Sequence, residues 1–148
     1  SFKKTGKNID PEIALLIPDA MKNHSWYVQQ LSHYIWNLTK SKATKVEFNK
    51  ALLEVIAANI PLFQNEIESL STTQVNVLKA IAKNETQLTS TAVMINYELG
   101  TPNNVSKNKK LLIEKDLILE TESGYEISDP VFELWFRKQF FNTPYIAA

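Results

Sequence analysis

Closely spaced helix start and stop signals after residue 70 limit the fold more than any other feature of this sequence. Ser71 and Gln74 form a capping-box pattern, in which each side chain bonds a backbone N–H that the first helical turn leaves unpaired. Gly100 is expected to end a helix, because glycine takes the left-handed conformation without strain. The pair Thr101-Pro102 starts the next helix at once. We therefore expect short helices here rather than one long helix.

Apolar residues recur at helical spacing between these signals. They predict one helix over about residues 71–83, a second over about 90–99 and a third from Thr101, with Val105, Leu112 and Ile113 on its buried side. The second and third helices are joined by a short turn that contains a glycine. This is the arrangement of a helix-turn-helix motif.

Two short apolar segments follow this motif. Residues 117–119 and 125–127 flank the turn residues 122–124, and this order predicts a β-hairpin. The pair Asp129-Pro130 then opens a final helix, whose aromatic face is too apolar to leave in water. A helix-turn-helix followed by a hairpin is a winged helix, so we expect a winged-helix domain over residues 69–148 that ends in an aromatic helix.

The first part of the chain, residues 1–68, is expected to be entirely helical. Its helix starts are Asp10 before Pro11, Ser25, and Thr44 with Glu47 three residues later. Residues 1–8 are expected to form a solvated tail or the end of a preceding domain. The lysines of that tail are Lys3, Lys4 and Lys7.

The composition excludes several classes of function. The 148 residues contain no cysteine, which removes disulfide scaffolds and thiolate zinc sites and favours a cytoplasmic protein. Three glycines cannot form the glycine-rich loops that hold nucleotide phosphates. His24 and His33 lie nine residues apart, which does not suit a shared metal on one helical face. We expect no metal site, no catalytic residues and, since the longest apolar run is Ile13 to Ile17, no membrane span.

Two segments resemble a known family. Residues 129–137, Asp-Pro-Val-Phe-Glu-Leu-Trp-Phe-Arg, resemble the D-P-x-F-x-x-W-x-R ending of the C-terminal winged helix in archaeal-type P-loop ATPases, a branch of the AAA+/STAND superfamily that is also abundant in Bacteroidetes. Residues 23–31 resemble the helical lid of the same family. The residues that carry the resemblance are Tyr27, Gln30, Leu31, Asp129, Pro130, Phe132, Trp135 and Arg137.

The resemblance implies a mainly α fold, with a helical lid-like bundle followed by a winged helix-turn-helix that has a small β-hairpin wing. It also implies a parent protein that binds ATP and Mg²⁺ on an N-terminal domain with Walker motifs, which this sequence lacks. Because the chain begins with Ser1 rather than methionine, we expect a non-catalytic C-terminal piece of that parent. Its implied partners are its own ATPase domain and either double-stranded DNA or another protein.

DNA contact would use the outward side of the second helix of the motif. Asparagine can pair with adenine edges, and lysine can bind phosphate or guanine. The candidate residues are Asn103, Asn104, Ser106, Lys107, Lys109 and Lys110. The net charge of the chain is zero, however, and carboxylates that would repel phosphate flank this helix and the hairpin. These are Glu114, Asp116, Glu120 and Glu122.

The sequence leaves two other functions open. The first is a transcriptional regulator that binds DNA through its winged helix without ATP. The second is a pure protein-docking module, for which the candidate anchors are Trp26, Trp36 and Tyr145, because tryptophan and tyrosine are favoured at protein interfaces. The salt dependence of DNA binding distinguishes these alternatives.

Overall fold

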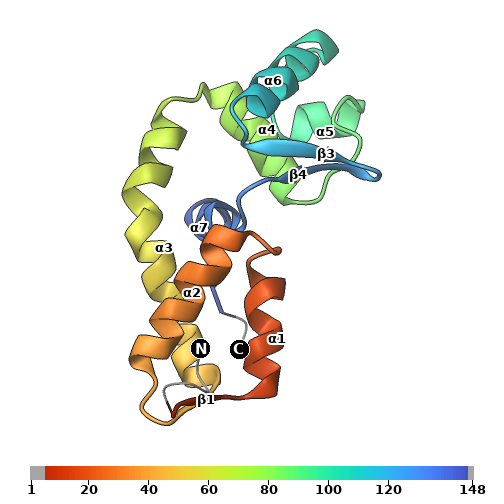
Figure 1. Ribbon diagram of the computed structural model, residues 1–148. Coiled ribbons are helices and arrows are strands. Elements are labelled where there is room, and N and C mark those ends of the chain that lie inside the picture. The colour runs from red at the N-terminus through yellow and green to blue at the C-terminus, as the bar shows by residue number, and fades with distance from the viewer. Residues whose placement is uncertain (1–5, 147–148) are drawn as a thin grey trace. The chain divides into compact units, whose positions relative to one another are not determined.

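The computed structural model describes residues 6–146 and divides the chain into two compact units. The first unit extends to Ile60 and also includes the segment from Pro144 on, whereas the second covers Pro61–Thr143. Helices dominate both units, and a short antiparallel hairpin lies in the second (Figure 1). The expected mainly α fold is confirmed.

The first unit contains helices α1 (Pro11–Ala20), α2 (Ser25–Leu38) and the first part of α3 (Lys45–Glu68). Asp10 caps α1 as expected, because its side chain accepts a hydrogen bond from the backbone of Glu12. The expected cap at Ser25 is wrong. His24 occupies the cap position without a side-chain hydrogen bond, because the left-handed residues Lys22 and Asn23 turn the chain just before it.

A parallel strand pair joins the two ends of this helical segment. Strands β1 (Asn8–Ile9) and β2 (Lys42–Ala43) pair directly, and the backbone of Asn8 donates to the carbonyl of Ser41 at 2.7 Å. The Nζ of Lys7 donates to the carbonyl of Trp36 at 2.9 Å. Lys7 and Asn8 are therefore part of the folded unit rather than of a solvated tail, and Lys3 and Lys4 lie outside the described residues.

The second unit contains the rest of α3, then α4 (Thr72–Ala82), α5 (Thr91–Asn96), α6 (Pro102–Glu114) and α7 (Pro130–Phe141). Both hydrogen bonds of the capping box at Ser71 are present, at 3.0 and 3.2 Å. Thr101 and Asp129 cap α6 and α7 as expected, and proline occupies the first turn of each.

The end of α5 differs from expectation. The helix ends at Asn96 rather than near Leu99, and Glu98, not Gly100, takes the first left-handed conformation after it, with φ of 56°. This early turn brings Leu99 into the core, where it is fully buried and its backbone donates to the carbonyl of Met94 at 2.9 Å. Gly100 is also left-handed, with φ of 82°, and leads into the cap of α6.

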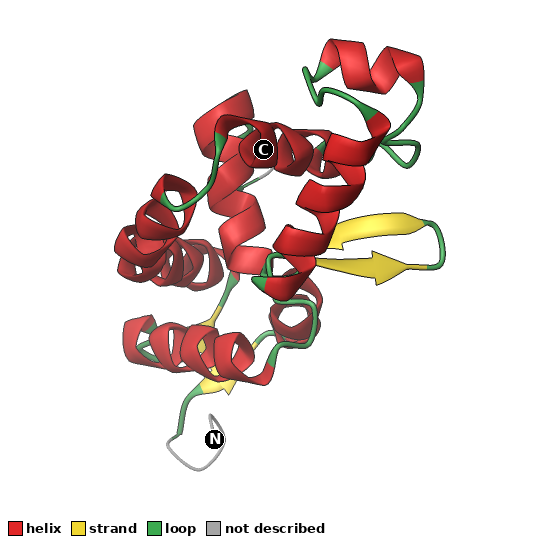
Figure 2. Ribbon diagram, turned by 90° about the horizontal axis from the view of Figure 1, so that it is seen from above, coloured by secondary structure: helices red, strands yellow, loops and turns green. Residues whose placement is uncertain are grey.

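The hairpin consists of β3 (Ile118–Thr121) and β4 (Gly124–Ile127), paired antiparallel with Ile118 opposite Ile127. Figure 2 shows the two strands in yellow, joined by a tight loop that extends beyond the helices. Ile118 and Ile127 are both buried, so the base of the hairpin packs on the core. The predicted hairpin is confirmed.

An aromatic cluster forms the core of the second unit around α7. Phe63, near the end of α3, contacts Phe132 edge-on, with ring centroids 5.4 Å apart, and contacts Trp135 at 5.7 Å. Phe132 and Phe136 are almost completely buried. This packing joins the last turns of α3 to α7, and it explains why the division between units falls inside α3 rather than between residues 68 and 69.

None of the helices in residues 6–146 has the length and apolar content needed to cross a membrane.

Candidate functional site

Helix α6 is held by two buried side chains on one face. Val105 and Leu112 are completely buried, and α6 packs on α4 and β3. At its start, the Thr101 hydroxyl oxygen accepts a hydrogen bond from the backbone of Asn104 at 3.2 Å. The cap and the two anchors fix the rotation of the helix, so its opposite face points to solvent.

The structure places the six predicted contact residues at different depths. Asn103, Ser106, Lys107 and Lys110 are exposed, whereas Lys109 is half-buried. The side chain of Asn104 is also exposed, but it folds back against Gly100 in the preceding turn. Its amide nitrogen lies so close that a Cβ placed on Gly100 would be 2.6 Å from it. Four of the six thus lie on the outward face, Asn104 lies at its edge, and Lys109 lies on the side of the helix that meets the hairpin.

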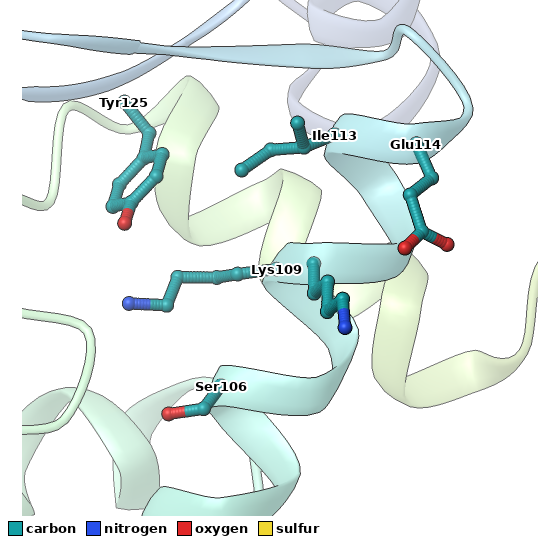
Figure 3. A pocket seen from close by; sticks show the side chains of 6 residues that line it. Ser106, Lys109, Ile113, Glu114 and Tyr125 are labelled. Carbon is teal, nitrogen blue, oxygen red and sulfur yellow. The ribbon is translucent and has the colours of Figure 1, made fainter.

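Lys109 reaches from α6 to the hairpin. Its Nζ lies 4.8 Å from the centre of the Tyr125 ring on β4, within the range of a cation–π interaction. Beneath this contact is a depression of about 480 Å³. It is lined by Ser106, Lys109, Lys110, Ile113, Glu114 and Tyr125 (Figure 3).

The charges of α6 and the hairpin have opposite signs. Among the described residues, none of the lysines Lys107, Lys109 and Lys110 forms an ion pair. The hairpin carries three glutamates and no basic residue, and Glu120 lies directly opposite Tyr125 in the strand register. Its glutamates are Glu120, Glu122 and Glu126. A basic helix face and an acidic hairpin therefore lie side by side.

Comparison with known proteins identifies the second unit. A family model described as a probable winged helix domain matches residues 61–138, more than half of the chain. The chain belongs to this winged-helix family. A search of curated proteins found no match, and neither did a search of solved structures.

The winged helix includes two site residues that the sequence analysis did not single out. Ile113 was expected to be buried but is 40% exposed, because Leu112 occupies the core-facing position beside it. Tyr125 was assigned only to the hairpin. Its alternation with the buried Ile127 puts both on one face of the hairpin, and this signal could have placed Tyr125 toward α6.

The family-motif residues of the winged helix have structural roles in α7. A carboxylate oxygen of Asp129 accepts hydrogen bonds from the backbone of Val131 and Phe132, both at 2.9 Å. Pro130, Phe132 and Trp135 are buried, and Arg137 pairs with Glu133 one turn earlier at 3.5 Å. These contacts start α7 and hold it against the core.

The matching residues of the first unit lie on α2. Tyr27 and Leu31 are buried, and the side-chain oxygen of Gln30 is buried without a hydrogen-bond partner among the described residues. His24 lies beside the Tyr27 ring, and His33 contacts the Asn37 amide at 3.1 Å. In residues 6–146 the structure contains no group of three or more residues suited to hold a metal.

The three proposed aromatic anchors are not equivalent. Trp26 is 68% exposed, whereas Trp36 is half-buried beneath the Nζ of Lys7, which lies 4.1 Å from its ring. Burial also raises the pKa of Tyr145 above its ordinary value. Of the three, only Trp26 presents most of its surface to solvent.

Proposed function

We propose that this chain is a non-catalytic C-terminal region of an ATP-binding protein of the AAA+/STAND type, and that its winged helix contacts a partner protein. One observation carries the protein contact: the basic face of α6 lies beside an acidic hairpin. DNA is uniformly negative along both strands, so three carboxylates at the wing oppose its approach. A protein surface with charges of both signs complements both parts of this face.

The ATPase parentage is supported by the two segments that resemble that family. If this proposal is correct, ATP and Mg²⁺ bind on an N-terminal domain, and this chain neither binds nor hydrolyses ATP. Sequence upstream of residue 1 that contains a Walker A motif would support the proposal, and its absence there would contradict it. A cytoplasmic location is part of the same proposal. The ATPase domain itself is one candidate partner protein.

A salt titration tests protein contact against DNA contact. Labelled duplex DNA is titrated with the 148-residue chain by fluorescence anisotropy, first at low salt and then at rising salt. We expect little binding at any salt concentration. Tight binding that weakens steeply with salt, and weakens further in Lys107→Ala and Lys110→Ala, would overturn the proposal.

A neutralised wing provides the matched control for this titration. The variant Glu120→Gln, Glu122→Gln, Glu126→Gln keeps the size of each side chain but removes three negative charges. We expect it to bind DNA more tightly than the unaltered chain at low salt, because it lacks three of the carboxylates that oppose phosphate beside the lysines of α6. Equal DNA binding by both proteins would show that the wing charges do not oppose DNA.

A DNA-binding regulator that acts without ATP is the second candidate. It is favoured by the exposed side chains of the outward α6 face, which begins in the first turn of the helix, where a recognition helix contacts base edges. These are Asn103, Ser106, Lys107 and Lys110. The steep salt dependence described above would select this function.

A further inference from the structure

The depression between α6 and β4 combines an apolar floor with a basic rim. Ile113 exposes 40% of its surface there, and Tyr125 is half-buried. Lys109 and Lys110 lie beside these two residues. Figure 3 shows Lys109 and Tyr125 extending into the same space, with Ile113 beside both of them and Glu114 pointing away from the tyrosine.

We infer that this depression binds a segment of a partner protein that presents acidic side chains next to an apolar one. The acidic groups face Lys109 and Lys110, and the apolar side chain covers Ile113 and Tyr125. The inference rests on the proposed function, since it names the chemistry of the partner that the winged helix contacts.

Charge complementarity supports an acidic segment. Neither Lys109 nor Lys110 has an ion-pair partner in the described residues, so an incoming carboxylate displaces no existing pair. The Tyr125 ring also restricts the ammonium of Lys109. A side chain that is already held loses less conformational entropy when a ligand binds, and this preorganisation favours binding.

The apolar floor distinguishes a peptide from nucleic acid. A phosphate backbone offers no aliphatic or aromatic side chain to cover Ile113. In addition, Glu120 lies opposite Tyr125 in the hairpin and would repel a second row of phosphates. A peptide can instead place its carboxylates over the two lysines and its apolar side chain over the floor.

Glu114 sets the direction of the bound segment. It lines the depression on α6, one helical turn after Lys110. A carboxylate there disfavours a second acidic residue at that end of the segment. The acidic part of the segment is therefore expected near Lys109, and its neutral or basic part near Glu114.

Binding is tested with short fluorescein-labelled peptides and the full 148-residue chain. The probe has two aspartates on one side of a Leu-Phe pair and two serines on the other. Two matched peptides replace either Leu-Phe by Ser-Ser or every aspartate by lysine, and duplex DNA is the fourth ligand. We expect the Asp/Leu-Phe probe to bind at least about tenfold more tightly than either matched peptide, because each lacks one of the two required features.

Variants locate the site. We expect the double variant Lys109→Glu, Lys110→Glu to bind the probe at least about tenfold more weakly. Lys138 is an exposed lysine on α7, and we expect Lys138→Glu to leave binding of the probe unchanged. Circular dichroism checks that the double variant is folded, and Lys110→Glu alone serves if it is not. Amide NMR shifts on probe binding are expected on α6 and β4.

The outcomes separate the inference from the proposed function. The inference is overturned if no peptide binds, or if the probe changes amide NMR shifts away from α6 and β4. It is also overturned if Lys138→Glu weakens binding as much as the double variant. In each of these cases, protein contact through another face remains open. If duplex DNA binds more tightly than the probe and loses affinity in the double variant, the inference and the proposed protein contact both fall.

Discussion

Helices α6 and α7 begin with the same signal but serve different purposes. Each starts with a side-chain acceptor followed by proline, and they have 13 and 12 residues. Helix α7 buries five of its residues, three of them aromatic, whereas α6 buries Val105 and Leu112. The start signal thus determines where a helix begins, and the composition of its faces determines whether it builds the core or remains available for contact.

The largest expected effect on stability comes from α7, the helix that builds the core. Phe136→Ala should lower the free energy of unfolding by about 3–5 kcal/mol, because it leaves a cavity among Phe132, Phe140 and Phe141. Ile113→Ala on α6 should cost less than about 1 kcal/mol, because Ile113 is already 40% exposed. Urea denaturation followed by tryptophan fluorescence measures both. Equal costs would show that the outer face of α6 is also structural.

Substitution of the residue before each cap should give the next largest difference in stability. Gly100, which precedes the Thr101 cap, has φ of 82°, a conformation that costs other residues roughly 1–2 kcal/mol. Gly100→Ala should therefore destabilise the chain by about that amount, and its Cβ would also displace the Asn104 amide. Ser128 precedes the Asp129 cap without a left-handed conformation, so Ser128→Ala is the matched control. Thermal denaturation that shows equal losses would contradict this account.

The two caps themselves should differ by a smaller amount. Asp129 accepts two backbone hydrogen bonds and Thr101 accepts one. Substitution of a cap by alanine costs about 0.5–2 kcal/mol, so we expect Asp129→Ala near the upper end and Thr101→Ala near the lower end. Urea denaturation of both variants at neutral pH makes the comparison. A larger cost for Thr101→Ala would indicate that α6 depends more on its start than α7 does.

Local signals in the sequence predicted most of the second unit. Capping pairs, proline after the cap and two-residue alternation are each contained within a few neighbouring residues, so Ser71, Thr101 and Asp129 were identified correctly as helix starts. The hairpin was identified for the same reason. Such signals act through contacts between residues close in sequence, in the first turn of a helix or in the loop of a hairpin.

Features that depend on distant residues were not predicted. The pairing of β1 with β2 joins Asn8 to Lys42, and no local pattern marks either segment as a strand. The early end of α5 depends on the burial of Leu99 in a core contributed by other helices. At the candidate site, the lysines were predicted from the helix alone, but the Lys109–Tyr125 contact requires the hairpin to fold beside α6.

The start of α3 is also capped, but the stabilisation from its cap depends on pH. In α3 the carboxylate comes from Glu47, the third residue of the helix, and accepts hydrogen bonds from the hydroxyl and the backbone N–H of Thr44. These bonds favour the ionised form and hold the pKa of Glu47 below its ordinary value of 4.5. Because the folded state binds the proton less readily than the unfolded state, the stabilisation is present above pH 4.5 and is lost as the pH falls through the lowered pKa.

Glu47→Gln tests this assignment, because glutamine keeps the length of the side chain but does not titrate. Near neutral pH the variant should be slightly less stable than the unaltered chain, and the difference should shrink as the pH falls below 4.5, when Glu47 itself becomes protonated. The effect is small because Glu47 is partly exposed and solvent screens it. Urea denaturation at several pH values measures the difference. A difference that stays constant with pH would mean that the Thr44–Glu47 contact does not depend on the negative charge.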